Sequence, residues 1–236
     1  GIRRPQSGQI LFDGHEYRAL TLKTSSKIGI EMVHQHSLSL NQYFTVAENL
    51  SLPKMPLFTG HKKTLHAVQA FFSHYDVTLA PSVLVEQLKA SDQVFVEILK
   101  HVYPTPKLLI LDETLEKLTA PAFNKIVYIL TILKREGASI LLITHRIDDI
   151  YSLADRVSII KNGEILLTDE VKNIDKLNLI KMAYTQISTE QHINHLNTEF
   201  YQFLKYNEAI LRNLPVNLIV VDKERRMKMV NNYCKQ

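Results

Sequence analysis

Tryptophan is absent from this chain of 236 residues, cysteine occurs once and glycine only seven times. The single cysteine, Cys234, excludes an internal disulfide and is typical of a reducing compartment. No apolar run is long enough to span a membrane, and no signal peptide is visible. Hydrophobic residues, at 45%, are enough to build a core. We therefore expect a cytoplasmic protein with one large domain and a smaller piece.

Concentrated basic charge and metal-ligand clusters are also lacking. The net charge of +4 is spread along the chain, and no basic-aromatic module accompanies it, so we expect no nucleic-acid partner. Several of the ten histidines have no cysteine or carboxylate at ligand spacing, and we expect no structural metal at His34, His36, His61, His66 and His74.

Two short apolar runs are the most informative feature. Residues 108–111 lead into Asp112 and Glu113, and residues 140–143 lead into Thr144 and His145. Such runs predict strands buried in a parallel sheet, where ligands bind beyond the carboxyl ends of the strands. The carboxylates there could hold Mg²⁺ and polarise water, and the histidine could reach a terminal phosphate. Alternatively, the carboxylates cap the next helix and His145 is an ordinary strand-end residue.

Further segments occur in a fixed order along the chain. They are Ser7 to Gly14, Gln35 after the run 28–33, Ala47-Glu48-Asn49-Leu50, Leu111-Asp112-Glu113, Thr144-His145, and the pair Asp155 to Val157 with Lys161 to Ile165. Together they resemble the nucleotide-binding subunit of an ATP-binding cassette (ABC) transporter, most closely the sugar-importer branch, from Gly1 to about Glu170.

The resemblance implies an α/β fold, the P-loop NTPase-like fold of ABC ATPases with a helical subdomain. It implies ATP and Mg²⁺ as cofactors, with Glu113 and His145 as catalytic residues. Gln35 and Asp112 would bind the nucleotide and its Mg²⁺. Since all four follow buried strands, we expect them to cluster at one edge of the sheet.

The phosphate-binding loop G-x-x-x-x-G-K-[ST] is absent from the sequence. We expect that the sequence is a piece of a longer protein, with this Walker A loop upstream and the first strands missing. The alternative is a natural chain that lost the loop and with it the amide cradle for phosphate.

The ABC signature is degenerate. Lys89 stands at the position of the signature serine and Ser91 at that of the signature glycine, while Thr114 replaces the proline after the Walker B glutamate. A side chain at Ser91 would block close approach of the backbone to phosphate. The resemblance therefore implies impaired ATP hydrolysis.

The local patterns predict hairpins at Asp13-Gly14 and at Asn162-Gly163. Helices are expected over 62–74 and 122–136, and residues 83–103 complete the helical subdomain. After Glu170, apolar residues recur at steps of three and four, which predicts one or two long helices between Leu177 and Leu211.

The last 25 residues predict two paired strands, 218–222 and 227–230, and resemble the opening of a PAS sensory domain. The alternative is an ordinary helix–hairpin extension. The predicted domains are a partial ABC ATPase over 1–170, a helical linker over 171–211 and a partial PAS-like segment over 212–236.

The main hypothesis is a nucleotide-binding module of a cytoplasmic signalling protein with a PAS domain and weak or no ATP hydrolysis. It would form a homodimer through the cassette and the linker, whose exposed apolar stripe would pair with a second copy. The alternative is the ATP-hydrolysing subunit of a sugar importer, peripheral to the inner membrane and bound to a membrane permease. A third hypothesis is an inert pseudo-cassette that serves as a dimerisation scaffold.

Overall fold

The computed structural model describes residues 6–35, 38–51, 61–103, 105–184, 209–211, 213, 215–221 and 226–235. The chain forms two units, Gly1–Arg146 and Ile147–Gln236. The domain limits expected at residues 170 and 211 fall inside the second unit and remain predictions. Within the described ranges, no helix is both long enough and apolar enough to cross a membrane.

The first unit opens with the predicted hairpin. Strands β1 (Ile10–Phe12) and β2 (His15–Tyr17) pair antiparallel. The turn residues Asp13 and Gly14 have φ angles of 52° and 76°, the left-handed conformation that this turn needs. A short helix that the sequence analysis did not predict follows, α1 (Leu22–Lys27). Thr21 caps it by accepting a hydrogen bond from the Thr24 amide at 3.1 Å.

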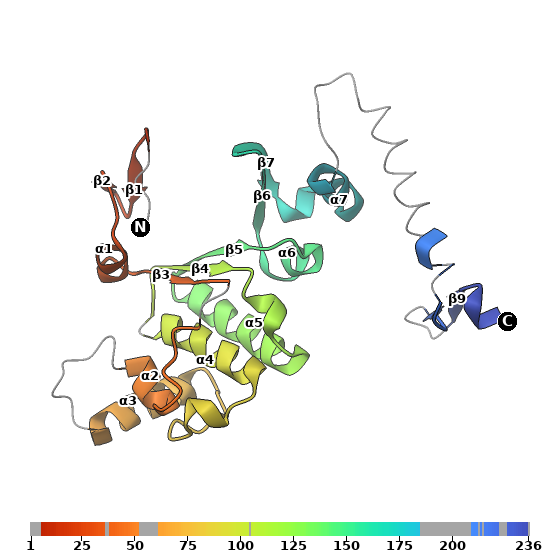
Figure 1. Ribbon diagram of the computed structural model, residues 1–236. Helices are drawn as coiled ribbons and strands as arrows, with labels where there is room; N and C mark the ends of the chain where they lie inside the picture. The colour runs from red at the N-terminus through yellow and green to blue at the C-terminus, as the bar shows by residue number, and fades with distance from the viewer. Residues whose placement is uncertain are drawn as a thin grey trace. The chain divides into compact units, whose positions relative to one another are not determined.

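Three parallel strands form the sheet at the centre of this unit: β3 (Ile30–Val33), β4 (Leu108–Asp112) and β5 (Ser139–Ile143), in that spatial order. Val33 pairs with Leu111, and Leu111 pairs with Leu142, so the carboxyl ends of the strands lie side by side (Figure 1). This confirms the two parallel strands that the apolar runs predict. Their expected burial on both faces is wrong for β5, where Ser139, Leu141 and Ile143 are exposed.

The helices of this unit are α2 (Val46–Ser51), α3 (His61–His74), α4 (Ala90–Val102) and α5 (Ala120–Arg135), with 3₁₀ turns η1 (Val85–Gln87) and η2 (Leu115–Lys117). The helices expected over 62–74 and 122–136 are confirmed. In the 83–103 region the α-helix begins only at Ala90. There the Gln93 side chain donates to the carbonyls of Val85 and Leu88 at 3.3 and 3.1 Å, which stabilises the preceding turn.

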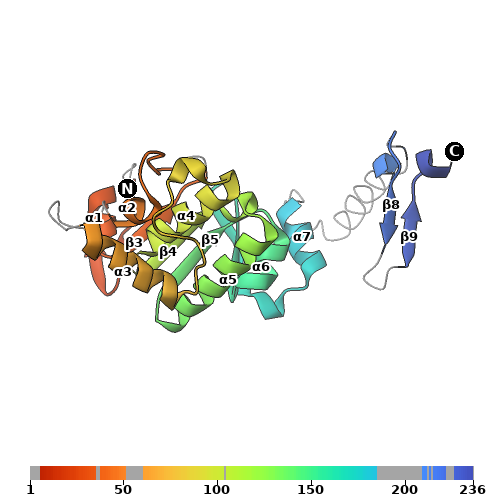
Figure 2. The ribbon, with the colours of Figure 1, turned by 90° about the horizontal axis from the view of Figure 1, so that it is seen from below.

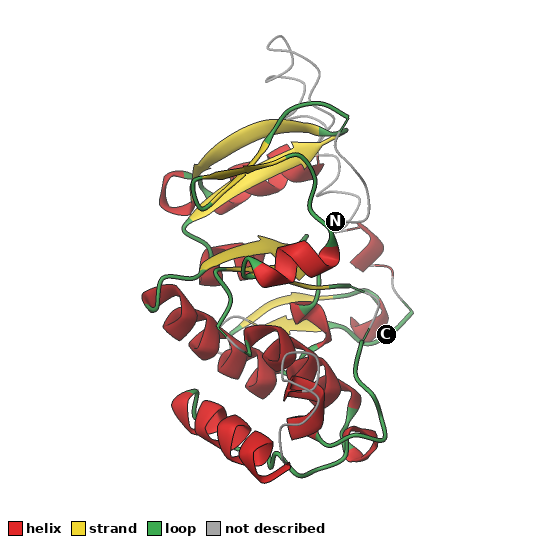
Figure 3. Ribbon diagram, turned by 90° about the vertical axis from the view of Figure 1, so that its left-hand side faces the viewer, coloured by secondary structure: helices red, strands yellow, loops and turns green. Residues whose placement is uncertain are grey.

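Helices α4 and α5 cover one face of the sheet, as Figure 3 shows, and Figure 2 views the unit from that side. Leu109 and Leu111 of β4 are fully buried on this face. On the opposite face Leu141 and Ile143 of β5 remain 50% and 42% exposed. Parallel sheets normally bury both faces. In the described residues, one face of this sheet is therefore only partly covered at its edge strand.

The second unit contains α6 (Ile147–Leu153) and the hairpin of β6 (Arg156–Lys161) and β7 (Glu164–Glu170). Asn162 and Gly163 turn this hairpin with φ angles of 50° and 84°, as predicted. After the turn η3 (Val171–Asn173), helix α7 (Lys176–Tyr184) contributes Leu179 to a small core with Ile159 and Ile174. Residues 185–208, where most of the predicted long helix falls, lie outside the described residues.

Near the end of the chain, β8 (Ile219–Val221) and β9 (Met227–Val230) pair antiparallel, which confirms the predicted strand pair; η5 (Tyr233–Lys235) follows. The buried Asn231 side chain joins the two ends of this hairpin. It donates to the Val216 carbonyl at 2.7 Å and accepts from the amides of Leu218 and Cys234 at 3.1 and 3.2 Å. The resemblance of this segment to a PAS domain is not tested by the fold.

Candidate functional site

Three of the predicted site residues meet at the carboxyl edge of the sheet. The Gln35 carboxamide, two residues after β3, donates a hydrogen bond to Glu113 Oε2. His145, two residues after β5, places its Nδ1 3.5 Å from Glu113 Oε1. The expected clustering of Gln35, Glu113 and His145 is therefore present, and it brings together residues up to 110 positions apart in the sequence.

Asp112 is the last residue of β4 and pairs in register with Ile143. Side chains alternate between the faces of a strand, so Asp112 lies on the face of Ile110 and opposite to Leu111. That face is the less covered one, where the ends of Leu141 and Ile143 are exposed. Asp112 therefore lies at the predicted edge, and its role as a Mg²⁺ ligand remains a prediction.

The turn after β4 aims the Glu113 side chain. Glu113 has a φ of 48°, which is unusual for a residue with a long side chain. Its amide donates to the Ile143 carbonyl at 2.9 Å. The buried Thr114 hydroxyl donates to the carbonyls of Asp112 and Val33 at 3.1 and 3.4 Å. Hydrogen bonds from all three strands thus hold this turn, and Thr114 fills the proline position with a structural hydroxyl.

Two further residues reach the same edge, and the sequence analysis missed both. Glu116 Oε1 lies 3.4 Å from His145 Nδ1. Lys117 Nζ donates to the backbone carbonyl of Gln35. Both belong to the 3₁₀ turn η2, which directs residues three and four positions after Glu113 back toward the strand ends. The spacing Glu113-x-x-Glu116 was the signal in the sequence that could have indicated a second carboxylate.

The degenerate signature positions lie at the start of α4. Lys89 is the exposed N-cap residue, and its carbonyl accepts from the amides of Asp92 and Gln93. Ser91 Oγ accepts a hydrogen bond from the Thr119 amide at 2.9 Å. Because Thr119 is the N-cap residue of α5, the Ser91 side chain ties together the first turns of two helices.

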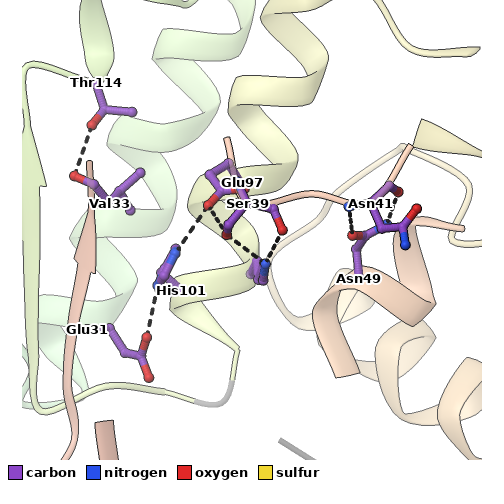
Figure 4. Close-up of polar contacts among 9 residues, drawn as sticks. Glu31, Val33, Ser39, Asn41, Asn49, Glu97, His101 and Thr114 are labelled. Atoms are coloured by element: carbon purple, nitrogen blue, oxygen red, sulfur yellow. Dashed lines mark hydrogen bonds and ion pairs between the residues drawn. The ribbon is translucent and has the colours of Figure 1, made fainter. Parts of the chain in front are cut away.

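A polar network joins β3, α4 and the segment that follows Gln35 (Figure 4). His101 lies between two carboxylates, with Nδ1 2.9 Å from Glu31 and Nε2 3.3 Å from Glu97. Glu97 in turn accepts from the Ser39 hydroxyl at 2.6 Å and the Ser39 amide at 3.0 Å. Lys100 donates to the Ser39 carbonyl at 2.9 Å. The network fixes the backbone four residues after Gln35.

Burial disfavours the charged forms of Glu97 and His101, but the hydrogen bonds in this network favour those forms more strongly. Burial raises the pKa of Glu97, but hydrogen bonds from His101 and Ser39 bring that pKa below its ordinary value. Burial likewise lowers the pKa of His101, but Glu31 and Glu97 hold it above its ordinary value. Each charged group is thus stabilised by its partners, and the network is strongest when Glu97 is ionised and His101 is protonated.

The sequence is similar to known ATP-binding proteins. Residues 1–116 match the ABC transporter family. A putative ribose/galactose/methyl galactoside import ATP-binding protein of Geobacillus kaustophilus is 31% identical over 187 residues, which cover 77% of this chain and 37% of that protein. The galactose/methyl galactoside import ATP-binding protein MglA of Pasteurella multocida is 29% identical over 218 residues, covering 91% of this chain and 43% of MglA. The chain thus spans about two-fifths of the length of these relatives.

Solved structures support the fold. A nucleotide-free ATP-binding cassette from an ABC transporter superposes with a TM-score of 0.62 at 19% identity, covering 79% of this chain and 80% of that one. The cassette MJ0796 in a dimeric post-hydrolysis state with ADP and Pi superposes with a TM-score of 0.61 at 19% identity, covering 72% and 76%. The fold is therefore the α/β fold of ABC ATPases.

The signalling hypothesis was wrong. It depended on the helical linker over 171–211 and on a PAS domain after it. A match that covers 91% of the chain includes residues 171–211, so the segment taken for a signalling linker also has a counterpart in a sugar-import protein. The relatives named above are import ATP-binding proteins, which favours the importer alternative.

Proposed function

We propose, on the premise that this chain carries an ATPase domain of the ABC transporter type, that it is the nucleotide-binding part of an ATP-hydrolysing subunit that energises sugar import. The observation that carries the proposal is the meeting of Gln35, Glu113 and His145 beyond three parallel strands. Residues from different strand ends, held by backbone hydrogen bonds, suit the positioning and electrostatic stabilisation that phosphoryl transfer requires.

In this proposal Glu113 orients and polarises the attacking water, and His145 contacts the terminal phosphate. Asp112 and the Gln35 carboxamide oxygen would hold Mg²⁺, since oxygen donors are the ligands that Mg²⁺ prefers. The Gln35 side-chain nitrogen already donates a hydrogen bond to Glu113, and the Gln35 side-chain oxygen is left to bind a cation. Bound Mg²⁺ would neutralise charge on the phosphates during transfer.

The domain is proposed to cover residues 1–170 and to end with the hairpin of β6 and β7, followed by segments over 171–211 and 212–236. Lys89 and Ser91 are proposed to stand at the signature positions that face nucleotide held by a second cassette. The protein would then work in the cytoplasm at the inner membrane, with two cassettes paired and a membrane permease as partner. The named relatives are ATP-binding proteins for the import of ribose, galactose or methyl galactoside, and these sugars are the first substrates to test.

The test measures ATP hydrolysis by the full-length protein and its Glu113→Gln variant. Loss of the catalytic carboxylate is expected to lower kcat by about 10²–10⁴-fold while ATP still binds. Glu136→Gln is the matched control, since Glu136 lies after α5 and contacts His74 rather than the sheet edge. Equal turnover by wild type and Glu113→Gln would overturn the assigned role. Uptake of labelled galactose or ribose into vesicles with the permease tests the substrate class.

A further inference from the structure

His145 faces two carboxylates with a single ring nitrogen. Its Nδ1 lies 3.5 Å from Glu113 Oε1 and 3.4 Å from Glu116 Oε1. Hydrogen bonds between a charged histidine and a carboxylate are usually shorter, about 2.7–2.9 Å, and the longer of the two at His101 is 3.3 Å. Two ligand atoms of one tetrahedral Zn²⁺, each bonded at about 2.1 Å, are separated by about 3.4 Å. The spacing around Nδ1 therefore matches atoms that share an ion.

The network at His101 supplies an internal comparison with the same residue types. There the two glutamates approach opposite ring nitrogens, with Glu31 2.9 Å from Nδ1 and Glu97 3.3 Å from Nε2. The ring separates those carboxylates, so they do not converge on a point. At His145 the three donor atoms lie within 4.8 Å of one another. The cluster at His145 differs from the one at His101 because its three ligand atoms converge on one point.

Two observations indicate that a ligand belongs there. Glu116 Oε1 is buried, and within the described residues it accepts no hydrogen bond. Its contact with His145 Nδ1 at 3.4 Å is an ion pair and not a hydrogen bond, and a bound cation would compensate this buried oxygen. Glu113 uses its other oxygen, Oε2, to accept from Gln35. Such a bond from an outer residue orients a metal-binding carboxylate.

We propose that Glu113, Glu116 and His145 form a site for a divalent cation of the zinc class, distinct from the Mg²⁺ of the nucleotide. Two carboxylates and one imidazole provide three protein ligands and leave a fourth position open, the arrangement of accessible zinc sites. The His145 side chain is 63% exposed, so the ion reaches the site directly from solvent.

The site has a consequence that rests on the proposed function. A cation bound to Glu113 and His145 withholds both from water and phosphate, so Zn²⁺ is expected to inhibit ATP hydrolysis. Binding itself needs no nucleotide, and it is measured separately. Failure of the metal site and failure of the ATPase assignment are therefore distinguishable.

The test titrates the purified protein with ZnCl₂ in a calorimeter and records the visible absorption of the Co²⁺-loaded protein. We expect one site that Glu116→Gln and His145→Gln each weaken at least tenfold, and the intense absorption of tetrahedral Co²⁺. The control is His74→Gln, because His74 contacts the single carboxylate of Glu136 at 2.7 Å and should not contribute.

Equal Zn²⁺ affinity in wild type and both ligand variants would overturn the proposal, as would the weak spectrum of octahedral Co²⁺. Circular dichroism checks that each variant is folded. If Glu116→Gln unfolds the protein, Glu116→Asp keeps the charge and retracts the oxygen. Glu116→Asp should still lower the affinity for Zn²⁺, and an unchanged Zn²⁺ affinity of this variant would contradict the proposed site.

Discussion

His101 illustrates how a single side chain gains its properties from distant partners. Glu31 lies 70 positions before it in the sequence and Glu97 four positions before it, and both contact its ring. The spacing of Glu97 and His101 on one helix could be read from the sequence, since residues four apart share a helix face. The contact with Glu31 depends on how α4 packs on β3, and nothing local predicts it.

The charged state of His101 makes stability depend on pH. Its pKa in the folded chain lies above the ordinary value of 6.5. Its contribution to the free energy of unfolding is therefore complete below pH 6.5 and is lost as the pH rises through the folded-state pKa. Glu97, with its pKa below the ordinary 4.5, stays ionised throughout this range.

We expect the wild type to exceed His101→Gln in free energy of unfolding by about 1.5–3 kcal/mol at pH 6, the usual range for hydrogen bonds to charged groups. This difference should shrink as the pH is raised to 9. Urea denaturation at several pH values measures it. His66→Gln, on an exposed position of α3, is the control. A difference that stays constant from pH 6 to pH 9 would show that His101 acts only by packing.

At the scale of elements, the two hairpin turns and the strands at the centre of the sheet could be predicted because their signals are local. Asn162-Gly163 adopts the positive φ angles that its residue types favour. The start of α4 was harder to predict, because Gln93 stabilises a separate turn before it through contacts with Val85 and Leu88. Helix α1 was missed because it buries no residue and so shows no apolar period.

Helices α4 and α5 are joined at their first turns by Ser91, which accepts from the Thr119 amide at 2.9 Å. We expect Ser91→Ala to lower the free energy of unfolding by about 1 kcal/mol, because the amide of the α5 N-cap loses its partner. Thermal unfolding measures the change. Thr131→Ala serves as the control: its hydroxyl donates to the Val127 carbonyl within the exposed surface of α5, and the change should be close to neutral.

At the scale of the whole molecule, we expect the partly covered sheet face to promote association. Among the strands in the described residues, β5 lies at the edge of its sheet, and its Leu141 is half exposed. Exposed apolar edge strands tend to pair with other chains, and a lysine there opposes such pairing. We expect Leu141→Lys to reduce the self-association of this chain, measured by light scattering, with a change in stability of about 1 kcal/mol or less.

Tyr128→Lys is the comparison for Leu141→Lys, since Tyr128 is similarly exposed, at 48%, but belongs to helix α5 and not to a strand. If both substitutions reduce association equally, added charge is the cause and the edge has no special role. The sequence analysis did not foresee this face, because the runs at β4 and β5 are equally apolar. Only the fold distinguishes the central strand from the edge.

The hydrogen bonds of the Asn231 side chain also make the chain suited to distance measurement by spin labelling. Cys234 is the single cysteine of this chain, and its amide is hydrogen-bonded to Asn231, which ties together the two ends of the β8–β9 hairpin. A nitroxide attached to Cys234 would follow the hairpin as one body, without any other cysteine of this chain having to be removed. In a particle with two copies, the pair of labels would give one interspin distance, whose change on adding nucleotide reports how the copies rearrange.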